Sequence, residues 1–453
     1  MKRKIIDNES DAECTVLSNH SPLFHVKTTL KVLRTLSGFP ILPTNSNWDN
    51  FEFIPSKEYP RLIIIIILFS VPINTIGYFY RYDLHALSAL YQIDVSKLDY
   101  FVEVFTLFFL PFCFNLVYFI NFKNSIKGLN SICENMSEIN SKQAQVHGLS
   151  QIHLKAKQKV EEYIVIFMMM GILIAALFVI SSYITFEFYD GGFLPDNVKA
   201  LLAAIQPAII LLGPISHIVS SGDFIIIYFI LHLTQNLECL RSVVEEENIK
   251  NKTEKFERSG KLGDLHSRNT SIKNGETESV ERYNKMNTLI DIALDIGDVL
   301  EKINVCFSGM LFCYYGGNLL IATSSFYSAT NYLFISEFSA LSLSMGLMSA
   351  ICFILYMGRL YILTTSAHLI GQEMTLLKKA MKGVFFKSSQ DWSIEQRKKE
   401  ILNEKFDTMI DRYGNNAPIS PYGYFSINGG SLLSALATII TYLIVLIQFK
   451  ISE

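Results

Sequence analysis

Seven stretches of this 453-residue chain are apolar, free of charged side chains and about as long as a membrane-spanning helix. Such a helix needs roughly 20 apolar residues in a row. Only 18% of the residues are charged, and these crowd into the gaps between the apolar stretches. A soluble chain carries about 25% charged residues, more evenly spread. The segregation predicts an all-α integral membrane protein with seven transmembrane helices and excludes most classes of soluble enzyme.

The stretch between 303 and 363 holds two spans, separated by a hairpin at Glu337. Directly after the fourth span, the apolar run 224–231 is too short to cross a membrane, so we expect it to continue the fourth helix below the membrane, packed on protein. An eighth span is the alternative. The expected spans are 62–80, 101–122, 163–185, 200–222, two within 303–363, and 431–449.

Lysine and arginine residues are distributed unequally on the two sides of these spans. Four segments that would face the same side hold 34 of the 39 basic residues: 1–61, 123–159, 241–302 and 378–412. Cytoplasmic loops carry such an excess, so the N-terminus is expected inside and the short tail 450–453 outside. A G-protein-coupled receptor has the reverse orientation. Arg359 is expected at the inner end of the sixth span, with its charge snorkelling to water.

The cysteines and glycosylation sequons agree with this orientation. All seven cysteines fall in spans or predicted cytoplasmic segments, where disulfides do not form. The sequons also lie on the predicted inside. The polar first sixty residues contain no cleavable signal peptide, so the first span is expected to direct insertion into the plasma membrane.

The cytoplasmic segments are of two kinds. Residues 233–302 are expected to extend the spans as helices, with a largely disordered insert at about 245–285 that is rich in Lys, Glu, Asn and Ser. A regulatory loop is the alternative for this insert. Residues 364–430 are expected to form anchor helices, among them an amphipathic helix at 393–413 that begins with a Ser393–Gln396 capping box. Its apolar face would pack on the helical extensions or lie on the membrane surface.

Motifs for catalysis or cofactor binding are missing from the sequence. It contains no HExxH, glycine-rich phosphate loop or GxSxG, and its nine histidines form no metal-ligand pattern. We therefore expect no enzyme activity, no metal and no cofactor. The net charge of −3 gives no reason to expect nucleic acid as a partner.

The last span ends with a polar residue beside an aromatic one. Val445, Gln448 and Phe449 are spaced so that they share one helix face. This face suits a pore lining, or alternatively Gln448 bonds a neighbouring helix and Phe449 anchors the span at the interface. The sequence Thr441-Tyr442, five hydrophobic residues, then Gln448-Phe449 resembles the signature of the insect gustatory receptor family, and the lead-in from Pro421 to Asn428 is also similar.

The resemblance implies a ligand-gated, non-selective cation channel of four subunits, homomeric or heteromeric. The seventh helix would line the central pore, with Val445, Gln448 and Phe449 at the gate. The intracellular helices would form a shared anchor domain. From the residues alone, a metabotropic seven-helix receptor and a transporter remain alternatives.

A small-molecule tastant is the implied partner, bound in the outer halves of the first six spans. Aromatic and polar residues there suit a hydroxylated or amphipathic ligand. Receptors for sugars such as sucrose or glucose often resemble a variant with Glu directly after Thr-Tyr, where this chain has Leu443. A fructose-type receptor resembles the hydrophobic version found here, but no Trp lies in a span. Bitter-type receptors are the remaining group, so the tastant stays open. The candidate pocket residues are Tyr78, Tyr80, Glu103, Tyr183, Gln206, Tyr315, Asn318 and Ser342.

Overall fold

The structure is a computed structural model that describes about half of the chain, mainly its second half. The expected spans at 62–80, 163–185 and 200–222 lie almost wholly outside the described residues, as does the first tail. Within that tail, strands β1 (Ile41–Pro43) and β2 (Phe51–Phe53) pair antiparallel. The described ranges are 41–43, 51–53, 110–144, 223–260, 268–335, 340–388, 396–413 and 418–452, with a few isolated positions.

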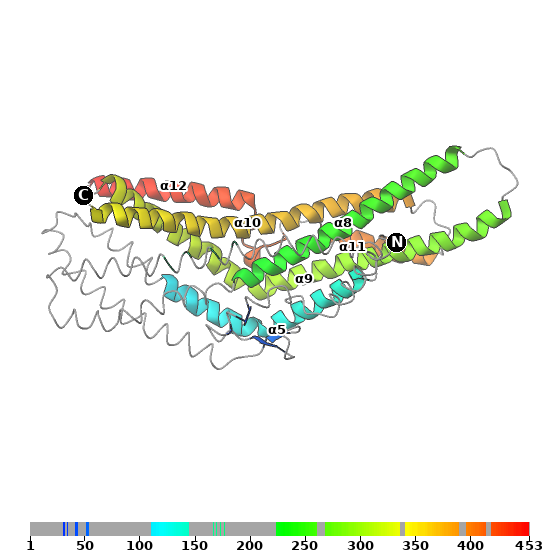
Figure 1. The fold of residues 1–453 in the computed structure, drawn as a ribbon, viewed down its shortest axis with the longest axis horizontal. Coiled ribbons are helices and arrows are strands. Elements are labelled where there is room, and N and C mark those ends of the chain that lie inside the picture. Colours follow the sequence, from blue (N-terminus) through cyan, green and yellow to red (C-terminus); the bar gives the residue numbers. More distant parts are fainter. Residues whose placement is uncertain are drawn as a thin grey trace, which may run out of the picture.

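Long helices make up nearly all of the described part (Figure 1). Helices α8, α9 and α10 run alongside one another, and α12 lies beside α10 at the end where the chain terminates (Figure 1). The helices are α5 (Leu110–Ala144), α8 (Asp223–Gly260), α9 (Arg268–Thr330), α10 (Ala340–Ser388), α11 (Gln396–Arg412) and α12 (Gly429–Ser452), with a π-helix, η4 (Asn331–Ile335), and a 3₁₀ turn, η5 (Pro421–Gly423).

Two of these helices are long and apolar enough to cross a membrane, over Val280–Phe334 and Ser349–Phe385. A shorter apolar stretch runs from Gly429 to Val445. These segments overlap the expected fifth, sixth and seventh spans. With 63 residues, α9 is about 95 Å long, roughly three times the thickness of the hydrocarbon core. Much of it must therefore lie outside any membrane that it crosses.

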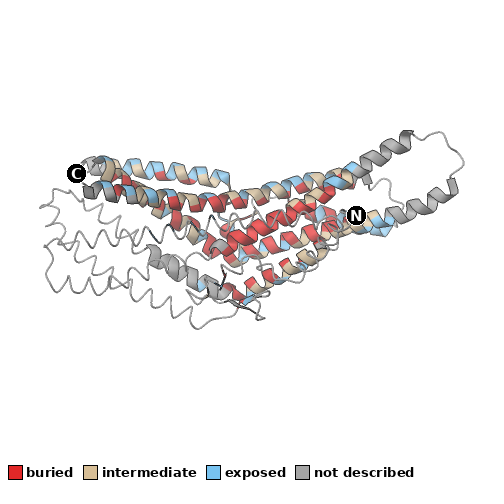
Figure 2. Ribbon diagram, in the orientation of Figure 1, coloured by how far each residue is buried: buried red, intermediate tan, exposed pale blue. Residues whose placement is uncertain are grey.

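Buried residues gather where α5, α8, α9 and α10 meet (Figure 2). In α8, every residue from Ile225 to Leu231 is at most 4% exposed. A helix that is apolar all round is stable only when it is covered on all sides. This burial confirms the expectation that the apolar run after Asp223 packs on protein. Helices α5 and α9 cross closely at Gly128, where a Cβ would lie 2.2 Å from the Cys306 sulfur.

The segment expected to be largely disordered is helical where the structure describes it. Helix α8 continues to Gly260, and α9 already begins at Arg268. Low hydrophobicity suggested disorder, but Glu and Lys are good helix formers. An ion pair between Lys285 and Glu247 also joins the two helices. In the same way, α5 continues past the expected end of the second span, at 122, as far as Ala144.

Candidate functional site

Helix α12 is attached to the rest of the chain along one narrow face. Ala435 and Ile439 are 4% and 1% exposed and pack towards α9 and α10. Ile439 belongs to a small apolar cluster with Ala322 of α9 and Tyr356 of α10. Two exposed faces remain on α12, and their chemistry differs.

One exposed face carries a polar stripe. Its members follow one another at spacings of four, three, four and three residues, which keeps them on one side of a helix. All five are exposed. The hydroxyls of Thr438 and Thr441 donate to carbonyls one turn back, at 2.8 and 2.9 Å, so they add polarity without leaving donors unpaired in an apolar setting. The stripe consists of four polar residues, Ser434, Thr438, Thr441 and Gln448, with the apolar Val445 between the last two.

The other exposed face of α12 is apolar and consists of Leu433, Ile440 and Ile444. These side chains are 69%, 52% and 50% exposed. Large apolar side chains suit contact with lipid, whereas hydroxyl and amide groups suit water or another protein surface. The helix therefore separates a lipid-compatible face from a face suited to an aqueous pore.

A capping box fixes the beginning of α12. The Asn428 side-chain oxygen accepts from the Ser431 N–H at 3.0 Å, and the Asn428 N–H donates to the Ser431 hydroxyl at 3.0 Å. This reciprocal pair satisfies two backbone donors that a helix end leaves unpaired. Just before it, the Ile427 N–H donates to the Ile419 carbonyl at 3.0 Å and closes the preceding turn.

Helix α11 packs on α9 and α10 with the apolar face that its sequence predicts. Leu402, Phe406 and Met409 are buried, and Tyr413 just beyond the helix donates its hydroxyl to the Ala293 carbonyl at 2.6 Å. Burial raises the pKa of the Tyr413 phenol, which therefore stays neutral. The interpretation that this amphipathic segment packs on protein agrees with these contacts. Ser393, the first residue of the expected capping box, lies outside the described residues.

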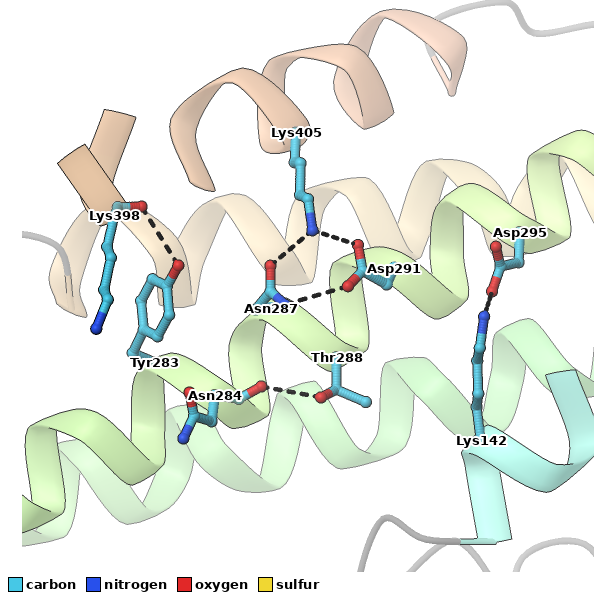
Figure 3. A network of polar contacts seen from close by, with 9 residues as sticks. All are labelled: Lys142, Tyr283, Asn284, Asn287, Thr288, Asp291, Asp295, Lys398 and Lys405. Carbon is cyan, nitrogen blue, oxygen red and sulfur yellow. Dashed lines mark hydrogen bonds and ion pairs between the residues drawn. The ribbon is translucent and has the colours of Figure 1, made fainter. Parts of the chain in front are cut away.

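A network of polar contacts runs along α9 (Figure 3). Lys405 of α11 donates to Asn287 at 3.0 Å and to Asp291 at 2.8 Å. One turn further along α9, Asp295 accepts from Lys142 of α5 at 2.7 Å. Hydrogen bonds to Asp295 and to Glu138 raise the pKa of Lys142. One side of α9 thus carries the charge contacts to both α5 and α11.

The sequence predicts that the charge of Arg359 in α10 reaches water, but the structure places it inside the protein. Its side chain is buried, and the guanidinium carbon lies 5.3 Å from the centre of the Tyr314 ring of α9. A cation over an aromatic face is stabilised by the ring quadrupole. The expected snorkelling is therefore wrong, because α9 supplies a partner inside the protein.

Of the expected ligand-pocket residues, Tyr315 and Asn318 can be placed with their side chains. Tyr315 is 7% exposed, and its ring centre lies 5.3 Å from that of Phe425, in the turn before α12. Asn318 is buried and donates to the Tyr314 carbonyl at 2.6 Å. Tyr315 thus lies beside the beginning of α12 and not towards its end. Ser342 lies in α10. Five further candidates, Tyr78, Tyr80, Glu103, Tyr183 and Gln206, lie outside the described residues.

A family profile described as "7tm Chemosensory receptor" matches residues 141–453, more than half of the chain. The chain belongs to the 7tm chemosensory receptor family. The expected membership of the insect chemoreceptor superfamily is thereby confirmed. Members of this family are membrane receptors, not enzymes.

The fold of this chemosensory receptor is also found in solved structures. It is similar to the insect olfactory receptor OR5 from Machilis hrabei in complex with eugenol, with a TM-score of 0.59 and 13% identity over 92% of this chain and 96% of that one. The structure of OR5 without eugenol matches with the same TM-score and identity over 94% and 99% of the two chains. No curated protein sequence matches the chain.

Sequence reasoning found only the end of the receptor's polar stripe. The terminal motif and its helix face include Thr441, Val445 and Gln448 but not Ser434 or Thr438, which lie earlier in the same span. Their spacing from Thr441 was the available signal. Phe449 lies within α12, but its side chain is outside the described residues.

Proposed function

We propose that this receptor is a gustatory receptor subunit that forms a tastant-gated, non-selective cation channel. Four subunits, identical or from sister receptors, would surround one pore lined by α12. The polar stripe on α12 carries the proposal. It is exposed in the single chain, it differs from the apolar face beside it, and a ring of such stripes would enclose a water-compatible path.

The gate is proposed at the last turns of the stripe, at Val445, Gln448 and Phe449. Val445 and Gln448 are exposed on the same face, and the helical spacing adds Phe449 to it. Rings of apolar side chains close pores by excluding water. A ring of Gln448 amides beside them would offer oxygen atoms to partly hydrated ions. The signature Thr441-Tyr442…Gln448-Phe449 would thus hold the closing element of the channel.

The rest of the arrangement follows from the charge distribution. Seven transmembrane helices would place the N-terminus in the cytoplasm and the end of α12 outside the plasma membrane. The cytoplasmic anchor domain would comprise α11 with the packed ends of α8, α9 and α10. Its support is the continuous buried core around Ile225–Leu231, which leaves these helices little freedom to separate.

The ligand is proposed to be a small organic tastant bound between the outer halves of the first six spans. OR5, whose fold is similar, has been solved with eugenol, a small aromatic molecule. Because Tyr315 packs beside the beginning of α12, it is a weaker candidate for an outer pocket than the sequence suggested. The choice among sugars, bitter compounds and other tastants is left to experiment.

Whole-cell and excised-patch recording tests the proposal. Cells expressing the chain, alone or with sister receptors, are exposed to a panel of sugars, bitter alkaloids and eugenol. We expect cation current that persists in excised patches without GTP. Strict dependence on GTP, with an N-terminal epitope accessible on intact cells, would instead establish a metabotropic receptor. Substrate uptake without channel-sized current would establish a transporter.

A further inference from the structure

The turn that leads into α12 is held by two side chains of α9. Asn304 donates its amide N–H to the Pro418 carbonyl at 2.5 Å and accepts the Ser420 N–H at 3.0 Å. Ser308, one helical turn further on, accepts the Tyr422 N–H at 3.0 Å. Three backbone groups of the turn are thus satisfied by α9 and not by the turn itself.

The backbone of this turn is strained where α9 holds it. Tyr422 has φ 52° and ψ 13°, and Gly423 follows with φ 73°. The left-handed region costs a residue with a side chain about 1–2 kcal/mol, whereas glycine adopts it freely. Such a conformation persists where the surroundings fix it. Here the Tyr422 N–H is itself the donor to Ser308, so the bond acts at the strained residue.

Contacts with the turn continue along the same face of α9. Phe312 approaches the rings of Tyr422, Tyr424 and Phe425 with centroid separations of 6.3–6.5 Å, and Tyr315 lies against Phe425. Asn304, Ser308, Phe312 and Tyr315 lie on one face of α9, over about 16 Å of the helix. This face of α9 therefore bonds the backbone of the turn at one end and packs on the aromatic rings of the turn at the other.

This turn fixes the beginning of α12. The bond from Ile427 to Ile419 closes it, and the Asn428–Ser431 capping box begins the helix directly afterwards. No flexible spacer separates the residues held by Asn304 and Ser308 from the first turn of α12. A shift of α9 along its axis must therefore pass to α12 or break these hydrogen bonds.

We propose that Asn304 and Ser308 are positioning residues that set the gating of the pore by fixing the strained turn before α12. The proposal rests on the channel function proposed above. Loss of either residue lets the turn leave its left-handed conformation, loosens the first turn of α12 and raises the current in the absence of ligand. The proposed gate lies near the other end of α12, whereas Asn304 and Ser308 contact the turn before the helix begins.

The first test compares ligand-free currents, normalised to surface expression. Ser308→Ala should raise the current about fivefold, the effect of one net hydrogen bond. Asn304→Ala should raise it further, because Asn304 makes two hydrogen bonds to the turn. Ser308→Thr keeps the hydroxyl and should behave as wild type. Thr323→Val is the matched control, because its hydroxyl donates to Leu319 within α9. Unchanged or lower ligand-free currents in both alanine variants would overturn the proposal.

The second test does not depend on conduction. Hydrogen exchange of the full chain in lipid nanodiscs is followed by mass spectrometry in peptides covering 429–437. Exchange should be faster in Ser308→Ala than in Ser308→Thr, although residue 308 contacts none of these amides. Equal exchange overturns the link from α9 to α12. If exchange responds while neither wild type nor any variant conducts under any condition, the channel function fails and the mechanical link stands.

Discussion

The rings of Phe385 in α10 and Phe406 in α11 lie parallel, with their centres 4.0 Å apart. Both side chains are almost fully buried, and both belong to the apolar core that α11 shares with the long helices. Lys405, the residue before Phe406 in α11, forms an ion pair with Asp291 of α9. Both of these side chains are about one third exposed. Apolar packing and not charge therefore attaches α11.

This difference predicts unequal effects of two neighbouring substitutions. Phe406→Ala should destabilise the docking of α11 by about 3–5 kcal/mol, the range for removing a large buried ring. Lys405→Ala should lose less than about 1 kcal/mol, because exposed ion pairs contribute little. Thermal unfolding in detergent, together with proteolysis of α11, measures both. Equal destabilisation by the two variants would contradict the assignment.

Two buried thiols report on the packing of α5 and α8. Burial raises the pKa of Cys133 in α5 and of Cys239 in α8 to about 12. The reactive thiolate is then roughly a ten-thousandth of the total at pH 8. In the folded receptor at pH 8, neither thiol should react with maleimide over minutes.

After denaturation the pKa falls to its ordinary value, and both thiols should label at once. Mass spectrometry of peptides containing Cys133 and Cys239 gives the readout. Because a raised thiol pKa favours the neutral form, labelling of the folded state should stay slow until the pH approaches 12. Rapid labelling at pH 8 without denaturant would show that α5 and α8 are not packed as described.

The hydrophobic pattern predicted much of the fold but not the polar continuations of α5, α8 and α9. It predicted the segments that became α9, α10 and α12, and the apolar face of α11. It did not predict that α5 continues past 122, and it assigned about 245–285 to a largely disordered insert, because a polar helix in water has no periodic apolar signal. The continuation of α5, α8 and α9 depends on propensity and on partners distant in sequence, such as Glu247 for Lys285.

The candidate site was predictable only in part, for a related reason. Spacing within one helix is visible in a sequence, so Val445 and Gln448 could be placed on one face. The partners of Arg359 and the residues that hold Tyr422 come from other helices. Asn304 and Ser308 lie over a hundred residues before the turn that they hold, and nothing in their local sequence indicates it.

The two exposed faces of α12 predict different reactivity of introduced cysteines. Thr441→Cys lies on the polar stripe and Ile440→Cys lies on the apolar face, and both positions are exposed. A charged methanethiosulfonate reagent needs water to reach and ionise the thiol. Block of the current should therefore be fast for Thr441→Cys and slow for Ile440→Cys. Ile439→Cys, on the buried face, serves as the unreactive control, and wild type controls for native cysteines.

Equal rates of block for Thr441→Cys and Ile440→Cys would contradict a pore along the polar stripe. Reaction of Ile440→Cys alone would place the pore on the other face of α12. Because the three positions are consecutive in one helix, differences in depth within the membrane cannot account for a difference in rate. The helix advances only about 1.5 Å from one residue to the next.

The gate assignment predicts that removing the ring at Phe449 opens the channel. Phe449→Ala should raise the ligand-free current on the order of tenfold, since the lost ring contacts would destabilise the closed state by about 1.4 kcal/mol in total. Ile444→Ala removes a similar bulk from the lipid-compatible face of α12 and should leave the current at the wild-type level. Recordings normalised to surface expression compare the two. A larger current in Ile444→Ala than in Phe449→Ala would place the closing element on the opposite side of the helix.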